Sequence, residues 1–120
     1  GGFLMGIVTS FIPGRIRLRS RIFRDDDIAS AFTSLLDATG IVTGIERNAN
    51  TGSFLVSYRA ECIPSAENLI GFASTYMPQL ARLKFRILYY TPQDKGAILS
   101  AISQASAALP EIKRRLLLNP

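Results

Sequence analysis

The stretch from Ile12 to Ile22 reads IPGRIRLRSRI, and its strict alternation constrains the fold more than any other part of the chain. Arginine takes every second position after the glycine, and Ile16, Leu18 and Ser20 stand between the arginines. Successive side chains of a β-strand point to opposite faces, so this pattern predicts a half-buried strand with an apolar inner face. The outer face of that strand would carry a row of four guanidinium groups: Arg15, Arg17, Arg19 and Arg21.

This arginine row has two interpretations. Neighbours on one face of a strand lie about 6.7 Å apart, so like charges repel each other and lower stability unless an anion is close. In the first interpretation the row is a solvated strand face that Asp and Glu side chains elsewhere neutralise in part. In the second it is a docking strip for a phosphate, an acidic lipid surface or an acidic protein. The pattern leaves both open.

The composition is that of a globular chain with an excess of positive charge. Of the 120 residues, 48% are hydrophobic and 19% are charged, which suits one domain with a buried core rather than a disordered segment. The net charge of +5 favours anionic partners but does not choose among nucleic acid, membrane and acidic protein.

Two residue types are nearly or wholly missing. The chain has no histidine, which removes Ser-His-Asp and Cys-His catalysis and every metal site that needs an imidazole. It has a single cysteine, Cys62, so no disulfide framework is available and a reducing, cytoplasmic compartment is expected. No run of eighteen apolar residues is present, so no membrane-spanning helix is predicted.

Strand periodicity covers three parts of the chain. The first predicted strand occupies 6–23 and is interrupted by a bulge or kink at Pro13-Gly14, because proline removes a ladder donor and glycine relaxes the backbone. Two further strands at 41–47 and 53–59 flank a stretch rich in turn-forming residues. These two are expected to form an antiparallel hairpin.

Helical periodicity covers most of the remainder. Helices are expected at about 25–38 and 64–76, and Asp25 to Asp27 would cap the first of them. The segment 83–90 fits both a strand and a helix, but its aromatic and β-branched content favours a closing strand. Two more helices are expected on either side of Pro110: 91–109 and 111–118.

This order of elements predicts an α+β fold of the ferredoxin-like βαββαβ type, an antiparallel sheet with two helices on one face. The predicted domain occupies residues 5–90, and residues 91–120 form a C-terminal helical extension.

Two stretches resemble a known family. Residues 40–48, GIVTGIERN, and 51–58, TGSFLVSY, resemble the second and third strands of heavy-metal-associated (HMA) domains. Those domains carry a Gly-Val, a Val-x-Val-Asn and a Thr-Gly before a Val-x-Tyr. With IPGRIRLR at 12–19 ahead of them, the chain looks like the divergent HMA-like group that occurs alone or ahead of metal-transporting P-type ATPases.

The chain departs from that family in its metal ligands. Ordinary members bind copper or zinc through Cys-x-x-Cys between the first strand and the first helix, but here residues 20–27 contain no cysteine. No metal site and no cofactor are therefore predicted. Cys62 is expected to be a small buried hydrophobe, and the run Asp25 to Asp27 to be a helix cap rather than a site for a hard cation.

Two other functions are weaker alternatives. Acylphosphatases share this architecture and use an arginine and an asparagine, roles that Arg15 with Asn48 or Asn50 could fill. The Gly-rich phosphate loop of that family is missing and no activated nucleophile is visible, so no enzymatic activity is predicted. RNA-recognition modules stack bases on strand aromatics, and the arginine face has none.

The resemblance and the arginine row together predict a non-enzymatic interaction or regulatory module in metal homeostasis or transport, with iron as the favoured metal. The partner would be an acidic protein surface or a metal-transporting ATPase at the cytoplasmic face of a membrane. The alternative is that the same basic face binds nucleic acid or anionic lipid. An edge strand would also allow a homo-oligomer. A basic segment near the C-terminus is expected to add to the partner-binding face: Lys113, Arg114 and Arg115.

Overall fold

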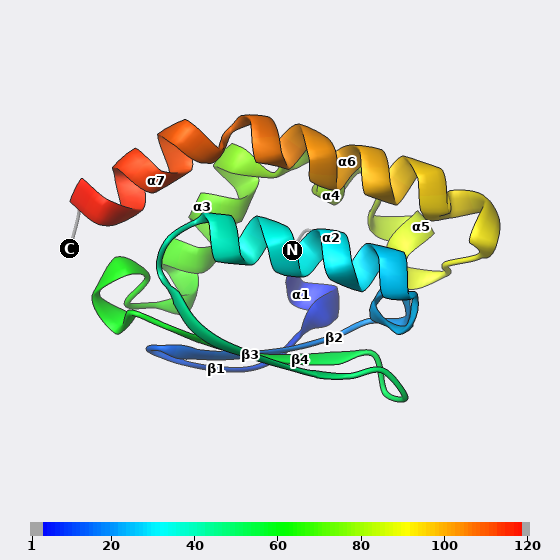
Figure 1. Ribbon diagram of the computed structural model, residues 1–120, viewed down its shortest axis with the longest axis horizontal. Coiled ribbons are helices and arrows are strands. Elements are labelled where there is room, and N and C mark those ends of the chain that lie inside the picture. Colours follow the sequence, from blue (N-terminus) through cyan, green and yellow to red (C-terminus); the bar gives the residue numbers. More distant parts are fainter. Residues whose placement is uncertain (1–3, 119–120) are drawn as a thin grey trace.

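The computed structural model describes residues 4–118 and consists of a four-stranded antiparallel sheet with helices stacked on one side of it (Figure 1). The strand order is β1-β2-β4-β3. Among the described residues, all helices lie on one face of the sheet, and the opposite face is open. The α+β class and the antiparallel sheet are as predicted, but the order of the elements along the chain is not.

The first two strands, β1 (Val8–Ile12) and β2 (Arg15–Arg19), form a hairpin in which Ile12 pairs with Arg15. The predicted single strand with a kink is therefore wrong. Pro13 and Gly14 make a two-residue turn instead, and Gly14 has a φ of 90°. Proline followed by a glycine with positive φ is a combination that favours a type II turn.

The predicted second hairpin is confirmed. It consists of β3 (Val42–Asn48) and β4 (Ser53–Tyr58). On β4 the side chains of one parity are buried against the helices: Phe54, Val56 and Tyr58. The turn is held by Asn48, whose Oδ1 accepts hydrogen bonds from the backbone N–H groups of Asn50 and Thr51 at 3.0 and 3.2 Å.

The first long helix is α2 (Asp26–Ala38), and its bounds are close to the predicted range of about 25–38. Its apolar face, with Ile28, Phe32 and Leu35, is buried. Phe32 also belongs to an aromatic cluster with Phe23 and Phe54, in which the ring centroids lie 4.8 to 5.7 Å apart. This cluster joins the helix to the centre of the sheet.

The expected closing strand at 83–90 is absent. After α3 (Ala66–Tyr76), the chain forms the short helices α4 (Pro78–Arg82) and α5 (Lys84–Leu88). In a βαββαβ fold the closing strand would pair beside the strand that carries the arginines, and β1 already occupies that edge. Residues 84–88 are helical instead, with Ile87 buried in the core, so the strand propensity of the segment does not decide its structure.

The last two helices form an outer layer above α2 (Figure 1). They are α6 (Lys95–Ala107) and α7 (Leu109–Leu118), and Pro110 lies in the first turn of α7. Ile98 of α6 and Ile112 of α7 are buried in the same core as the sheet residues. No helix within residues 4–118 is long and apolar enough to cross a bilayer.

The remaining elements are short: α1 (Leu4–Ile7), η1 (Arg21–Arg24), η2 (Ala60–Cys62) and η3 (Pro92–Asp94).

Candidate functional site

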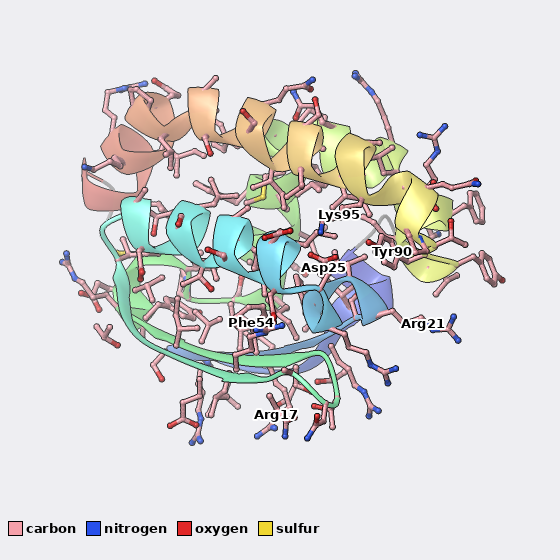
Figure 2. All side chains as sticks on the ribbon, turned by 45° about the vertical axis from the view of Figure 1, so that its right-hand side comes forward. Arg17, Arg21, Asp25, Phe54, Tyr90 and Lys95 are labelled. Atoms are coloured by element: carbon pink, nitrogen blue, oxygen red, sulfur yellow. The ribbon has the colours of Figure 1, made fainter. Side chains whose placement is uncertain are left out.

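Strand β2 places three arginines on the open face of the sheet. Along the strand, exposed and buried residues alternate without exception, and Ile16 and Leu18 face the core. Figure 2 shows Arg17 pointing away from the sheet on the side opposite the helices. The predicted outward orientation is therefore confirmed for three members of the row, here called the sheet-face arginines: Arg15, Arg17 and Arg19.

The strands beside β2 leave these guanidinium groups accessible. On β4, the residues opposite Arg15, Arg17 and Arg19 in the register are Ser57, Leu55 and Ser53, none of them acidic. A shallow depression of about 270 Å³ lies on this face beside the first two arginines, and its lining comes from three strands: Ser10, Ile12, Arg15, Arg17 and Leu55. The open face is therefore a basic surface with short neutral neighbours.

The sheet-face arginines have no carboxylate within 4.0 Å among the described residues. Seven ion-pair contacts occur in that part of the chain, and all of them involve other basic residues. Glu46 of β3 stands in the same cross-strand row as Arg17, but β4 lies between them. Two strand spacings separate the backbones of Arg17 and Glu46 by about 10 Å, and the two side chains form no ion pair within 4.0 Å. Within the described residues the sheet-face arginines therefore have no direct ion-pair partner.

Arg21 does not belong to the row, which corrects the prediction of four arginines on one strand. The strand ends at Arg19, because Ser20 turns the chain into η1. The Ser20 backbone N–H donates to the carbonyl of Gly52 at 2.9 Å, and its hydroxyl accepts from the N–H of Ile22 at 3.3 Å. Arg21 is exposed, but in Figure 2 it points to the side of the molecule while Arg17 points down.

The basic segment of α7 lies on the far side of the helical layers and does not extend the sheet face (Figure 1). Two of its cations already have an anion in the same helix. Arg114 Nε lies 3.0 Å from Glu111 Oε2, and Arg115 Nε lies 3.6 Å from Glu111 Oε1. The hydrogen bond from Arg114 lowers the pKa of Glu111. The structure therefore does not bring Lys113, Arg114 and Arg115 together with the sheet-face arginines.

Of the three aspartates at the start of α2, Asp25 caps the helix as predicted. Asp25 Oδ1 accepts from the backbone N–H groups of Asp27 and Ile28 at 2.9 and 3.0 Å. Lys95 Nζ lies 3.0 Å from Asp25 and 2.6 Å from Asp27. Burial by itself would raise the pKa of Asp25, but the hydrogen bonds from Ile28 and Lys95 outweigh it and lower that pKa. No three His, Cys, Asp or Glu side chains in the described part of the chain are placed to hold a metal ion.

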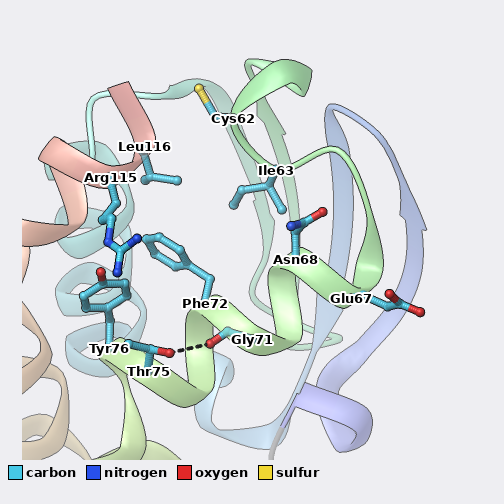
Figure 3. Close-up of a pocket in the computed structure, with 10 residues that line it drawn as sticks. All are labelled: Cys62, Ile63, Glu67, Asn68, Gly71, Phe72, Thr75, Tyr76, Arg115 and Leu116. Atoms are coloured by element: carbon cyan, nitrogen blue, oxygen red, sulfur yellow. Dashed lines mark hydrogen bonds between the residues drawn. The ribbon is translucent and has the colours of Figure 1, made fainter. Parts of the chain in front are cut away.

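Cys62 lines a cleft of about 350 Å³ between α3 and α7 (Figure 3). The cleft also contains Glu67, Tyr76 and Arg115. In Figure 3 the Arg115 side chain extends toward Phe72 and Tyr76, away from the Cys62 sulfur. Cys62 is half-buried and packs against the core. Its surroundings are those of a packed apolar residue, although its burial is less complete than expected.

The residues considered for acylphosphatase chemistry are not brought together. Arg15 lies at the turn end of β2, whereas Asn48 belongs to the cross-strand row of Arg19. Four strand residues separate the two rows by about 13 Å. The Asn48 carboxamide oxygen is also engaged in its own turn.

A second basic group became visible only in the structure. Four cations line one cavity of about 390 Å³ at the end of β2: Arg19, Arg21, Arg24 and Lys84. The three-residue spacing of Arg21 and Arg24 on a 3-10 turn could have indicated half of this group. Nothing in the sequence pattern links Lys84, some sixty residues later, to them.

A comparison of the chain with protein-family models, with curated proteins and with solved structures gives no match. The resemblance to HMA domains therefore stays a prediction from residues 12–19, 40–48 and 51–58.

Proposed function

We propose that this protein is a non-enzymatic interaction module that binds an acidic protein surface through the sheet-face arginines. The observation that supports this best is the combination of exposure and missing anions. Arg15, Arg17 and Arg19 are all exposed on a sheet face that no described helix covers, and none has a carboxylate within 4.0 Å among residues 4–118. An acidic partner would relieve the repulsion along the row.

The geometry of the row favours a partner of a particular kind. Arginine binds a carboxylate with two parallel hydrogen bonds, so each guanidinium can hold one Asp or Glu in a defined orientation. The row repeats every two residues, about 6.7 Å. An extended partner segment with acidic residues at alternate positions has the same repeat, and it is the ligand that this surface fits best.

The role in metal handling rests on the resemblance to HMA domains. In that setting the partner is a metal-transporting ATPase or another acidic protein of iron homeostasis, in the cytoplasm, and the chain itself carries no metal. Pairing of two copies through the edge strand β1 also stays a prediction.

The test is a binding measurement with a charge-reversed pair. The variant Arg15→Glu/Arg17→Glu should bind a synthetic peptide with glutamate at alternate positions at least about 100-fold more weakly, because two charged hydrogen-bonding contacts are lost. A pull-down from the native cell with the same variant should lose the acidic partner.

The matched control changes the net charge equally at another place. Arg114→Glu/Arg115→Glu alters the α7 surface and should leave peptide binding unchanged. Circular dichroism verifies that both variants fold. Equal losses in the two variants would mean that net charge, not the sheet face, drives binding. Binding of RNA that falls steeply as the salt concentration rises would favour the nucleic-acid alternative instead.

A further inference from the structure

The end of the molecule formed by η1, α5 and the β3–β4 turn exposes large apolar side chains. Phe85 and Tyr89 are 71% and 69% exposed, and Leu88 is 48% exposed. Their spacing of three and four residues puts them on one side of α5 and its C-terminal cap. Ile87, on the other side, is buried in the core. The buried Ile87 therefore anchors α5 to the core. The three exposed side chains, here called the apolar stripe, point into solvent: Phe85, Leu88 and Tyr89.

The basic cavity described above is continuous with this stripe. Leu88 and Lys84 line the cavity together with Arg21 and Arg24. Lys84 Nζ also lies 5.9 Å from the centre of the Phe85 ring. Four cations and three apolar side chains thus share one end of the molecule, here called the basic-apolar end and defined by these residues: Arg19, Arg21, Arg24, Lys84, Phe85, Leu88 and Tyr89.

The nearby acids do not neutralise this group. Asp94 contacts Arg86 at 3.9 Å, and Asp26 contacts Arg47 at 3.0 Å. Asp25 and Asp27 are both occupied by Lys95. Within the described residues, the four cavity cations have no carboxylate closer than 4.0 Å. The cavity therefore has the electrostatic character of a phosphate site.

We infer that the basic-apolar end binds the surface of a bilayer that contains anionic phospholipid. Lipid phosphates occupy the cavity between Arg21, Arg24 and Lys84, and Phe85, Leu88 and Tyr89 enter the interfacial layer. Peripheral membrane binding needs both components, buried apolar area and attraction to anionic headgroups. Aromatic side chains with one polar end are suited to the headgroup level, and Tyr89 has this character.

The shape of this end favours a membrane over the other anionic partners. The stripe lies on the exposed side of the five-residue helix α5 and its C-terminal cap. Only Leu88 of its three residues lines the cavity, and Phe85 and Tyr89 stand on exposed surface outside it. Single-stranded nucleic acid would need successive open aromatic faces for base stacking. Here aliphatic Leu88 lies in the stripe with the two aromatic residues, and Lys84 covers one face of the Phe85 ring.

This inference is independent of the proposed function, because it uses a different surface. Figure 2 shows Arg17 and Arg21 pointing in different directions, so the sheet face stays accessible when the basic-apolar end is occupied. Arg19 lies at the boundary of the two surfaces and is left unchanged in the tests.

The first test is sedimentation of the full chain with lipid vesicles. Vesicles of phosphatidylcholine with phosphatidylglycerol should bind the protein, and vesicles of phosphatidylcholine alone should not. Arg21→Glu/Lys84→Glu should weaken binding at least about 25-fold, since each basic residue at an anionic surface contributes about fivefold. Phe85→Ser/Tyr89→Ser should weaken it by about tenfold or more through lost apolar burial.

Two controls separate this surface from general charge and hydrophobicity. Arg15→Glu/Arg17→Glu makes the same charge change on the sheet face and should keep most of the lipid affinity, since neither residue lines the cavity and exposed charges are screened over a Debye length of about 8 Å. Ile12→Ser removes an apolar side chain that is 56% exposed beside the opposite end of β2 and should have no effect. The acidic-peptide measurement on Arg21→Glu/Lys84→Glu should stay normal.

The second test reports insertion directly. The chain has no tryptophan, so Tyr89→Trp introduces a single fluorescent reporter. Its emission should shift to shorter wavelength with anionic vesicles and stay constant with inorganic phosphate, whereas the emission of Ile12→Trp should not shift. Absence of vesicle binding, an unshifted emission of the Tyr89→Trp variant, or equal loss in the sheet-face variant would overturn the inference. Phosphate or RNA binding without vesicle binding would assign the cavity to a soluble anion and overturn it as well.

Discussion

Two of the basic surfaces of this protein, on β2 and on α7, have similar composition and opposite organisation. On β2, Arg15, Arg17 and Arg19 stand at every second position, so each cation has another cation as its neighbour on the same face. On α7, Arg114 and Arg115 lie three and four residues after Glu111, so one carboxylate faces both guanidinium groups. The period of the secondary structure decides the difference: a strand face repeats like charges, and a helix face can bring an acid beside them.

This comparison shows why a positive net charge is a poor guide to a binding surface. The α7 arginines are solvent-exposed, but both contact the carboxylate of Glu111 in the same helix. The arginines of β2 carry an unbalanced charge that an external anion can neutralise. What identifies the candidate site is therefore the missing counter-ion and not the number of arginines.

The largest effect on stability is expected at Gly52, in the β3–β4 turn that packs against the end of β2. Gly52 has a φ of 68°, and a Cβ at this position would lie 2.2 Å from the carbonyl oxygen of Ser20. Gly52→Ala should therefore lower the free energy of unfolding by about 3 kcal/mol or more, which urea denaturation would measure. Gly44→Ala is the matched control on β3, where the nearest atom is 4.0 Å away. A small effect of Gly52→Ala would mean that the contact between Gly52 and Ser20 does not hold the end of β2 against the β3–β4 turn.

The next largest effect on stability is expected at Asp25, which caps α2 and forms an ion pair with Lys95. Asp25→Ala should cost about 1 kcal/mol because the N-cap acceptor is lost. Asp25→Asn keeps the cap and removes only the charge that faces Lys95, so its cost should be smaller.

The contribution of the Asp25 charge should depend on pH in one direction. The folded-state pKa of Asp25 is lowered, so the charged form stabilises the folded protein. This contribution is complete above the unfolded pKa, about 3.9, and is lost as the pH falls through the lower folded value. Denaturation of the wild type and Asp25→Asn at several pH values should show their difference shrinking in acid. A stability difference between the two proteins that grows in acid would contradict the conclusion that the charged form of Asp25 stabilises the fold.

The smallest effect distinguishes the two basic surfaces directly. Arg17→Gln should raise stability by about 0.5 kcal/mol at low salt, because it relieves repulsion along β2. The gain should disappear in 1 M salt, where the Debye length is about 3 Å. Glu111→Gln on α7 should have the opposite sign, since it removes the anion from Arg114 and Arg115. Thermal melts of both variants at two salt concentrations would measure these changes in stability. A change in the same direction for both variants would remove the distinction between the two surfaces.

Local patterns predicted much of the fold correctly. The alternation in β2 predicted which side chains are exposed, and the spacing of Ile28, Phe32 and Leu35 predicted the buried face of α2. These predictions succeed because the period of a strand or a helix is a property of the backbone and needs no knowledge of distant residues. The capping role of Asp25 is local in the same sense.

The wrong predictions share a different cause. Pro13-Gly14 can serve as a bulge or as a hairpin turn, and only the pairing of β1 beside β2 selects the turn. The segment that became α5 has both strand and helix character. Once β1 lies beside β2, a strand at 83–90 can no longer pair with β2 as the βαββαβ order requires.

The amino-acid sequence by itself determined the faces: which arginines point outward on β2 and which apolar residues enter the core. Only the tertiary structure decided which strand lies beside β2, and with it the exposure of Phe85 and Tyr89 and the meeting of Lys84 with Arg21 and Arg24. The reason is that side-chain direction follows from the backbone period within a few residues, whereas neighbours in space depend on the competition of distant segments for the same sheet edge.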